Sequence, residues 1–402
     1  MKISIEKSIA KGTVFAPPSK SIAQRLLICG ALSEGSVISN IEFSEDILAT
    51  LDCLKALGAQ VEIDKNVVSL GGLLKGLKNS ATLNCRESGS TMRFLLPFCL
   101  LCDGEKTLKG SGRLIERPFE PYEKICEERN ILFIKNDDSI TVNGVIESGE
   151  FTLSGEISSQ FISGLLFVLP LLNGDSIINI TGNLQSASYL KLTLSALKNF
   201  GIKVDYGDIK KIKVFGNQKY ENKKLSVEGD YSNAAFLDAF NILGGDVKLK
   251  GLNDNSLQGD KVYKELFEKL KGANPVISLA DCPDLGPVLF SIAAVCNGAL
   301  FTDTARLRIK ESDRIVCMQK ELSKFGVKSD ADENTLRIYP AELITPAVPI
   351  FAHNDHRIAM AMTILLSKTG GVLEGAESVR KSFPDFYEKI SALKIKVNID
   401  ET

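Results

Sequence analysis

One pattern recurs along the chain and constrains its fold more than any other sequence feature. A helix with apolar spacing ends at Gly or an equivalent residue, a short strand follows, and a polar turn leads into a second strand. In the clearest copy the helix covers residues 51–57, Gly58 ends it, and the strands cover residues 59–63 and 67–70. Alternation with period 2 predicts that each strand buries one face. The glycine is expected to adopt the positive φ that terminates helices.

Five further copies follow, at intervals longer than those of solenoid repeats. Their helices are expected at residues 122–130, 190–200, 262–271, 316–325 and 386–393. The fourth copy is weaker, because only one strand, at residues 275–279, follows its helix and Gly272. The sixth copy ends within the strand at residues 395–399. Each interval leaves room for a second helix and further strands, so the repeat predicts a compact α/β (α+β) assembly rather than an open superhelix.

The length of the chain and the number of copies predict two domains. A chain of 402 residues is too long for one ordinary hydrophobic core. Six units divide naturally into two groups of three, and the turn-rich segments at residues 17–19 and 227–232 are candidate crossovers between the groups. We therefore expect a discontinuous domain, residues 1–19 and 230–402, that holds both termini. Residues 20–229 are expected to form the second domain.

Composition excludes several classes of protein. The formal net charge of −2 gives no indication of nucleic acid or an acidic membrane surface as a partner. Residues 1–5 alternate like a strand rather than a signal peptide, and the apolar runs at 94–102 and 165–172 are far shorter than the ~20 residues of a membrane span. Nine cysteines at irregular positions favour reduced thiols in a cytoplasm. Two histidines are too few to favour a zinc site, so no metal is expected.

Basic and hydroxyl residues recur at the expected helix starts, where free N–H groups and the helix dipole favour anions. The first segment places Lys20 and Arg25 after a proline-fixed turn, with Ser19 or Ser21 as the N-cap. Another segment puts small hydroxyl residues around Gly89, ahead of an apolar run. Each segment is also compatible with an ordinary capped helix start. From the local sequence alone, both interpretations stay open.

Further segments of the same kind lie at residues 113–118, 157–161, 281–287, 306–314, 353–357 and 381–387. Arg117 precedes a proline that holds its backbone extended. Ser158 and Ser159 can hold phosphate oxygens without adding net charge. Asp284 precedes an apolar helix and could simply be its N-cap. If the helix starts of the two domains face one another, these residues would form a cleft that attracts substrates with several phosphates and carboxylates.

Taken together, the segments resemble the motifs of 5-enolpyruvylshikimate-3-phosphate synthases, a family of enolpyruvyl transferases. The matching segments occur in family order across nearly the whole chain: Lys20-Ser21-x3-Arg25, residues 88–93, Glu116-Arg117-Pro118, Ser158-Ser159-Gln160, residues 309–314, residues 354–360 and residues 381–385. The resemblance implies a two-domain inverse α/β barrel, in which three βαβαββ units surround a pseudo-threefold axis in each domain. It also places the active site in the cleft between the domains, with no cofactor and no metal.

The resemblance assigns substrate-binding roles to individual residues. Shikimate 3-phosphate would contact Lys20, Ser21, Arg25, Ser158, Ser159, Gln160, Ser186, Tyr189, Asp284, Arg306 and Lys310. Phosphoenolpyruvate would contact Lys20, Gly89, Arg117, Gln160, Arg314, Arg357 and Lys381, because bidentate Arg contacts suit both its carboxylate and its phosphate. The second domain would hold shikimate 3-phosphate, and the discontinuous domain would hold phosphoenolpyruvate together with Asp284 and Glu311.

The implied reaction is an addition followed by an elimination, in a cytoplasmic and monomeric enzyme whose domains close on the substrates. Asp284 would take the proton of the 5-hydroxyl of shikimate 3-phosphate, and Glu311, together with Lys20, would protonate the methylene carbon of phosphoenolpyruvate. Phosphate would then leave, helped by the surrounding Arg and Lys side chains. The product is 5-enolpyruvylshikimate 3-phosphate, an intermediate on the route to chorismate and the aromatic amino acids.

Three alternative functions are compatible with parts of the sequence. The sister enzyme that acts on UDP-N-acetylglucosamine carries Lys-Asn where this chain has Lys20-Ser21, and it uses a loop cysteine, whereas Cys126 lies in an expected helix. A nucleic-acid enzyme similar to RNA 3′-phosphate cyclases is disfavoured by the net charge of −2 and the low aromatic content. A non-catalytic anion-binding protein on the same scaffold would need neither Asp284 nor Glu311.

Overall fold

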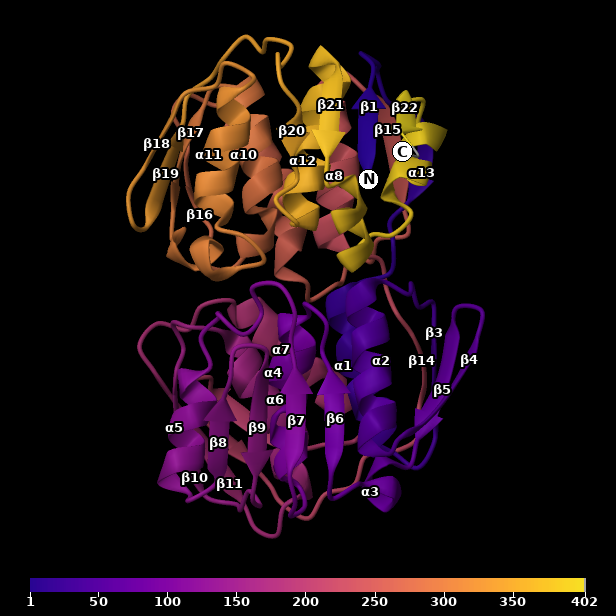
Figure 1. The fold of residues 1–402 in the computed structure, drawn as a ribbon, viewed down its shortest axis with the longest axis vertical. Coiled ribbons are helices and arrows are strands. Elements are labelled where there is room, and N and C mark those ends of the chain that lie inside the picture. Colours follow the sequence, from indigo (N-terminus) through magenta and orange to yellow (C-terminus); the bar gives the residue numbers. More distant parts are fainter. Residues whose placement is uncertain (401–402) are drawn as a thin grey trace. The chain divides into compact units, whose positions relative to one another are not determined.

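The computed structural model describes residues 1–400, and the chain divides into two compact units (Figure 1). Unit 1 comprises Met1–Pro17 and the segment that starts at Gly229, whereas unit 2 comprises Pro18–Glu228. The chain thus passes between the units after Pro17 and after Glu228. The sequence placed these crossings after residues 19 and 229.

In unit 2, twelve strands and the helices between them follow one another along the chain. The strands are β3 (Ser36–Ser39), β4 (Gln60–Asp64), β5 (Val67–Gly71), β6 (Ala81–Asn84), β7 (Lys106–Lys109), β8 (Leu132–Lys135), β9 (Ser139–Asn143), β10 (Glu150–Ser154), β11 (Ser176–Thr181), β12 (Val204–Asp208), β13 (Lys211–Val214) and β14 (Lys224–Ser226). The helices are α1 (Lys20–Leu32), α2 (Glu45–Leu57), α3 (Leu73–Gly76), α4 (Gly89–Leu95), η1 (Pro97–Leu100), α5 (Glu120–Glu128), α6 (Ser159–Val168), η2 (Leu169–Leu171) and α7 (Ala187–Asn199).

 The last strand, β14, comes from the C-terminal end of the unit and pairs with β3 near its start.

These strands of unit 2 form three four-stranded sheets of the same design. The sheet orders are β6-β7-β9-β8, β10-β11-β13-β12 and β14-β3-β5-β4. In each sheet the first two strands are parallel and the last two form an antiparallel hairpin. Parallel neighbours need a crossover helix, which α4 supplies between β6 and β7. The expected helix, turn and hairpin pattern is thus one βαβαββ unit, and unit 2 has three of them.

Unit 1 contains the remaining elements. Its strands are β1 (Lys2–Ile5), β2 (Lys11–Phe15), β15 (Asp246–Lys250), β16 (Val276–Ser278), β17 (Ala299–Thr302), β18 (Ser329–Ala331), β19 (Thr335–Ile338), β20 (Ile350–Phe351), β21 (Gly371–Glu374) and β22 (Val397–Asp400). Its helices are α8 (Tyr231–Ile242), η3 (Gly259–Val262), α9 (Tyr263–Leu270), η4 (Pro283–Leu285), α10 (Gly286–Val295), η5 (Ala305–Ile309), α11 (Arg314–Ser323), α12 (His356–Thr369), η6 (Ala376–Lys381) and α13 (Phe386–Ala392).

Two of the three sheets in unit 1 repeat the design of unit 2. Their orders are β16-β17-β19-β18 and β20-β21-β1-β22. In the second, β1 from the start of the chain pairs with β22, so the N-terminal strand supplies the partner that the sixth copy lacks (Figure 1). The expected strand at the start of the chain is therefore confirmed, and both ends of the described chain lie in one sheet.

The third sheet of unit 1 has only the parallel pair β2 and β15, so the fourth copy has no hairpin. The strand expected after α9 does form, as β16, but it pairs with β17 in the following repeat. The expectation that Gly272 has a positive φ is wrong, because Asn274 takes the left-handed conformation instead (φ 46°). Gly58, in contrast, ends α2 with φ 118° as expected.

Each unit has its own hydrophobic core, built around helices that are apolar on all sides. In unit 1, α8, α10 and α12 contact one another, and nearly every residue of α10 and α12 is buried. A fully buried Leu, Ile or Phe contributes roughly 1.5–3 kcal/mol. These helices are therefore firm supports for the polar residues at their N-terminal ends.

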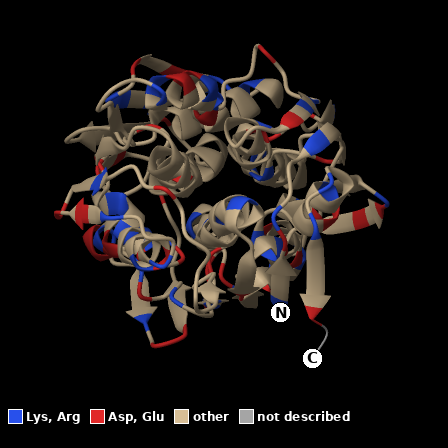
Figure 2. Cartoon of the chain, turned by 90° about the horizontal axis from the view of Figure 1, so that it is seen from above, with Lys and Arg blue, Asp and Glu red and all other residues tan. Residues whose placement is uncertain are grey.

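Charged residues of both signs are interspersed over the outer elements of the chain in the view of Figure 2. Within residues 1–400, no helix combines the length and the apolar character that crossing a bilayer requires.

Candidate active site

In unit 1, the carboxylate of Asp284 lies among three cationic side chains. Its Oδ1 accepts from Arg314 Nη1 at 3.1 Å and from Lys310 Nζ at 3.5 Å, and its Oδ2 accepts from Arg357 Nη2 at 3.0 Å. Asp284 lies in η4, and Leu285 is the residue before α10, so the interpretation of Asp284 as an ordinary N-cap is wrong. Its carboxylate contacts three cationic side chains instead of capping the helix.

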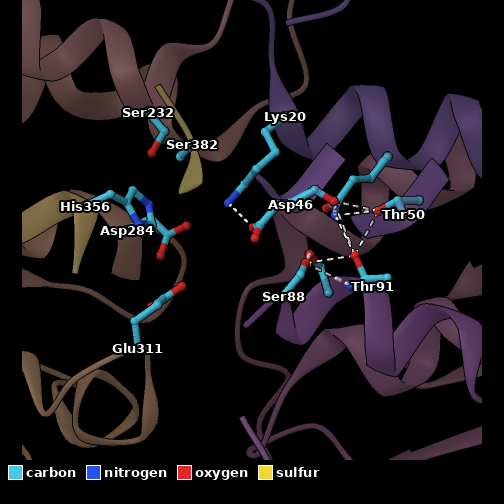
Figure 3. Close-up of polar contacts among 12 residues, drawn as sticks. Lys20, Asp46, Thr50, Ser88, Thr91, Ser232, Asp284, Glu311, His356 and Ser382 are labelled. Atoms are coloured by element: carbon cyan, nitrogen blue, oxygen red, sulfur yellow. Dashed lines mark hydrogen bonds and ion pairs between the residues drawn. The ribbon is translucent and has the colours of Figure 1, made fainter. Parts of the chain in front are cut away.

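Arg314 connects Asp284 to Glu311. The guanidinium has no exposed side-chain surface, and its Nη2 donates to Glu311 Oε2 at 2.8 Å while its Nε donates to Asp355 Oδ2 at 2.8 Å. Burial alone would lower the pKa of Arg314, but the three carboxylates, led by Asp355, raise it above its usual value. Arg314 is therefore a permanent cation that fixes both acids, whose carboxyl groups lie close together in Figure 3.

Lys310 is the cation of this group that can lose its charge. Burial lowers its pKa to about 8, Asp284 opposes the shift, and the like charges of Arg306 and Arg314 add to it. Its side chain nevertheless keeps 25% of its surface exposed, so it can reach a ligand. The ammonium group contributes to anion binding most fully below pH 8.

Arg357 extends the network from Asp284 to a second buried acid. Its Nη1 donates to Ser232 Oγ at 2.7 Å, and Ser232 in turn is hydrogen-bonded to Asp260. Burial and the nearby charge of Asp284 raise the pKa of Asp260 to about 7, although Arg357 and Ser232 oppose this, and Asp230 adds to it. Asp260 thus titrates close to neutral pH behind the residues that would contact substrate.

The loop before α12 and the end of η6 complete the group in unit 1. Asp355 caps α12 by accepting from the backbone N–H of Arg357 at 2.9 Å, while its other oxygen holds Arg314. Lys381 Nζ donates to the carbonyl oxygen of Asn354 at 2.5 Å. The one aspartate therefore sets the positions of two arginines that the sequence assigned to phosphoenolpyruvate.

In unit 2, Lys20 at the start of α1 forms an ion pair with Asp46 of α2 (Figure 3). Lys20 Nζ and Asp46 Oδ2 are 2.7 Å apart, and both side chains are largely buried. Ser19 is the N-cap residue of α1, which leaves Ser21 inside the first turn. The carboxylate of Asp46 orients the lysine, which keeps 15% of its side-chain surface exposed.

Arg25 is more deeply buried than a surface anion-binding residue would be. Its Nε donates to Thr193 Oγ1 at 2.8 Å, and its other nitrogens donate to the carbonyl oxygens of Ser21 and Tyr189. Burial lowers its pKa to about 10. Arg25 thereby joins α1 to α7 and fixes the backbone beside two other predicted ligands.

The start of α6 carries the predicted phosphate-binding serines. Ser158 is the N-cap, and its Oγ accepts from the N–H of Gln160 at 3.3 Å. Gln160 Oε1 accepts from Arg93 Nη1 at 2.9 Å, and Arg93 also donates to the carbonyl oxygen of Pro118. Arg93 therefore links Gln160 to the chain next to Arg117.

Gly89 and Arg117 are in close contact. Ser88 caps α4 by accepting from the N–H of Thr91, and Gly89 is the first residue of that helix. A Cβ atom on Gly89 would lie 2.6 Å from Arg117 Nη1, so only glycine lets the guanidinium approach the helix start this closely. Ser186 precedes α7 with φ 56°, a backbone conformation that non-glycine residues seldom adopt.

The structure thus brings the predicted residues together within each unit. In unit 1, Asp284, Lys310, Glu311, Arg314 and Arg357 share one network, with Arg306 acting on Lys310 by its charge. In unit 2, the predicted residues lie at the starts of α1, α4, α6 and α7 and beside them.

Sequence reasoning assigned no role to several residues that hold these groups in place, among them Asp46, Arg93, Ser232, Asp260 and Asp355. Arg93 stood inside a recognised motif, and Ser232 stood in a predicted crossover. Asp46 and Asp260 had no local feature that separates them from ordinary surface acids.

The chain matches one family of known proteins. The family model described as EPSP synthase (3-phosphoshikimate 1-carboxyvinyltransferase) matches residues 6–390. Curated proteins named 3-phosphoshikimate 1-carboxyvinyltransferase are similar along nearly their whole length. The one from Clostridium kluyveri is 38% identical and the one from Clostridium acetobutylicum is 40% identical, with 97% of each chain covered in both cases.

Solved structures of EPSP synthase from Acinetobacter baumannii have a similar fold. One superposes with a TM-score of 0.77 at 24% identity, covering 99% of this chain and 100% of that chain. Another has a TM-score of 0.79 at 22% identity and covers both chains completely. These likenesses confirm the predicted two-domain α/β fold.

Proposed function

Because the chain belongs to the EPSP synthase family, we propose that Asp284 and Glu311 carry the proton transfers of its reaction. The reaction is the transfer of the enolpyruvyl group of phosphoenolpyruvate to shikimate 3-phosphate in the shikimate pathway. UDP-N-acetylglucosamine is not favoured as the acceptor, because the matching family and relatives act on 3-phosphoshikimate. The same match removes the support for a nucleic-acid enzyme or a non-catalytic binding protein.

One observation carries this assignment: a single buried guanidinium, that of Arg314, donates to both acids. Asp284 and Glu311 keep 20% and 18% of their side-chain surface exposed, so each can reach a substrate from its fixed position. A base and an acid that work on neighbouring atoms must be held at a set distance. Arg314 provides this constraint.

Asp284 takes the proton of the 5-hydroxyl, and that oxygen attacks C2 of phosphoenolpyruvate as Glu311, assisted by Lys20, protonates the methylene carbon. The bond from C2 to the phosphate oxygen then breaks and its electron pair leaves with the phosphate. Glu311 takes back a proton from the new methyl group, and the proton held by Asp284 passes to the leaving phosphate. Charge develops on the leaving phosphate, which favours nearby cations. Arg117, Arg314, Arg357 and Lys381 are the proposed contacts of phosphoenolpyruvate, together with Lys20, Gly89 and Gln160.

Shikimate 3-phosphate is proposed to contact the serines and basic residues at the helix starts of unit 2. Ser158 and Ser159 stand at the N-terminus of α6, where backbone N–H groups favour a phosphate. Lys20, Ser21, Arg25, Gln160, Ser186 and Tyr189 complete the proposed contacts in this unit, and Asp284, Arg306 and Lys310 are those in unit 1.

Deuterium incorporation tests the acid and base roles. In D₂O, addition puts a deuteron on the methyl group of the intermediate, and elimination leaves part of that label in the product. Glu311→Gln and Asp284→Asn should each lose turnover and labelling together, because addition needs both groups. If either variant turns over and labels its product at the wild-type rate, that residue does not have the proposed role.

Since the proposed contacts are divided between the two units, we also propose that substrate binding closes the units on one another. Small-angle X-ray scattering should show a smaller radius of gyration with shikimate 3-phosphate than without it. An unchanged radius would rule out closure but leave the proton-transfer roles intact.

Monomeric state and a cytoplasmic location belong to the same proposal. All nine cysteines are free thiols, as expected in a reducing compartment. Light scattering on a sizing column should give a mass near the 43.7 kDa of one chain, and a mass near twice this value would contradict the monomer.

A further inference from the structure

A cysteine, a histidine and a glutamate lie together in unit 1, apart from the proposed catalytic groups. Cys317 and Glu321 stand on α11 with the spacing i, i+4, which puts both side chains on one face of the helix. His353 comes from the segment before α12; its Nε2 is hydrogen-bonded to Glu321, and Cys317 lies close enough to raise its pKa. None of the three residues has a role in the proposed reaction.

Glu321 is the fixed anion of this group. Its side chain has no exposed surface, and its carboxylate accepts from Lys324 Nζ at 2.6 Å and from the N–H of Phe351 at 2.9 Å. Although burial opposes the shift, hydrogen bonds from His353, Lys324 and the Phe351 N–H hold the pKa of Glu321 below its usual value. An anion held in this way can orient a neighbouring imidazole.

His353 is the cation of the group. Its Nε2 lies 2.7 Å from Glu321 Oε1, and its side chain is 21% exposed. The hydrogen bonds to Cys317 and to Glu321 raise the pKa of His353 to about 9, so the imidazole is protonated at neutral pH. Its backbone is left-handed (φ 52°), as is that of Asn354 (φ 54°), which fixes the turn that presents the ring.

The exposure and the surroundings of Cys317 differ from those of the other cysteines. Six of the nine are buried, and only Cys102, Cys296 and Cys317 are partly exposed. Cys102 contacts the carbonyl oxygen of Lys78, and burial raises the pKa of Cys296. Only two histidines occur in the chain, and His353 is the one beside a partly exposed thiol. Cys317 therefore combines access with a cationic hydrogen-bond partner.

We propose that Cys317, with His353 and Glu321, is a reactive thiol site that forms mixed disulfides with small disulfide compounds. A nucleophile beside an imidazole that a third group orients is the general arrangement of an activated side chain. Reactive cysteines are likewise found in partly exposed positions next to positive charge. The proposal does not depend on the proposed enzymatic function.

The exchange reaction is balanced without a further oxidant. The Cys317 thiol gives its proton to solvent, because His353 already carries one, and the imidazolium can hydrogen-bond to the sulfur anion. That sulfur attacks one sulfur of the compound, a new S–S bond forms, and the S–S bond of the compound breaks. The second half leaves as a thiolate with the bonding electron pair.

Labelling of the full chain with 5,5′-dithiobis(2-nitrobenzoic acid) at pH 7 tests the site. The colour of the released thiolate follows the rate, and peptide mass spectrometry identifies the modified cysteine. Cys317 should react first, about tenfold faster than Cys102 and Cys296, because only Cys317 has the imidazolium beside it. Cys317→Ser should remove the fast phase, and the double variant Cys102→Ser/Cys296→Ser should keep it.

His353→Asn separates the effect of the imidazole from that of simple access, since Asn tolerates a left-handed backbone. The rate at Cys317 should fall several-fold in this variant. Glu321→Gln is a second variant, which removes the charge that orients the imidazole. Circular dichroism and the melting temperature show whether each variant is folded. The proposal is overturned if Cys317 of the wild-type chain reacts no faster than Cys102 and Cys296, or if folded His353→Asn reacts as fast as wild type.

Discussion

The candidate site residues of unit 1 are mostly ionised groups held against one another, whereas those of unit 2 are mostly hydroxyl, amide and backbone groups at helix starts. In unit 1, three cations surround Asp284, and Lys310 and Asp260 have pKa values of about 8 and 7. In unit 2, Ser158 uses its hydroxyl to cap α6. The charge of the first region is therefore expected to change with pH, whereas the second region depends mainly on where its hydrogen-bond donors lie.

This difference matches the two tasks that the reaction sets. Proton transfer needs acids and bases whose charge can change, and Asp284 and Glu311, the two groups proposed for it, are both in unit 1. Binding a phosphate needs donors that stay in place, and helix starts supply them without titrating. Lys20, Arg25 and Arg117 are the charged exceptions in unit 2, and the charge of Lys20 is paired with that of Asp46.

Loss of a proton-transfer group should have the largest effect and should separate the two regions most clearly. Asp284→Asn should lower kcat by about 10²–10⁴-fold, the usual contribution of a general base. Ser159→Ala in unit 2 should instead raise KM for shikimate 3-phosphate about fivefold, the loss of roughly one hydrogen bond, with kcat nearly unchanged. Steady-state kinetics measures both, and equal losses of kcat in the two variants would abolish the distinction.

Geometry at the start of α4 should have the next largest effect. Gly89→Ala puts a Cβ atom 2.6 Å from Arg117 Nη1, so the guanidinium must move. KM for phosphoenolpyruvate should rise about tenfold, the loss expected for a weakened hydrogen bond to a charged group. Gly35→Ala is the matched control, because no atom lies within 4 Å of the added Cβ. A normal KM in Gly89→Ala would show that Arg117 does not act from this position.

The pH dependence of substrate capture should come from unit 1. The pKa of Lys310 is lowered to about 8, so its positive charge is lost as pH rises through 8. The value of kcat/KM for the anionic substrates should then fall severalfold above pH 8. Lys310→Arg keeps its charge at every pH in this range, and its profile should stay level there. A wild-type profile that is already level would exclude Lys310 as the titrating group.

The smallest effect concerns stability. The pKa of Asp260 is raised from 3.8 to about 7, so between these values the folded protein binds more protons than the unfolded chain. Its contribution to stability is therefore present below pH 4 and is lost as pH rises through 7. Asp260→Asn should gain stability over wild type across this window, on the order of 1 kcal/mol or more. Thermal unfolding from pH 4 to pH 8 measures this gain, and a constant difference would contradict it.

Much of the fold followed from the sequence because each repeat is specified locally. Apolar spacing sets the helices, period-2 alternation sets the strands, and residues such as Gly58 end the helices. The fourth copy shows the limit of this reasoning. The strand after α9 was expected, but its pairing with β17 depends on a partner that follows α10 in the sequence.

The positions of candidate residues at helix starts were predictable where they stand in recognisable motifs, as with Lys20, Ser159 and Arg357. It was not predictable where a residue acts through space. Asp46 meets Lys20 from another helix, and Asp260 acts on Arg357 from a separate segment, through Ser232 and by its charge. Asp284 illustrates both cases, because it was predicted as a site residue but its contacts with three cationic side chains were not predicted.

The sequence by itself determined the family, the repeated helix and hairpin units, and the kinds of side chain available for binding anions. The tertiary structure decided which charges meet and which of them are shielded from water. Local spacing fixes secondary structure, since those interactions span only a few residues. The pKa of Lys310 or Asp260 depends instead on burial and on charges from distant segments, which exist only once the chain has folded.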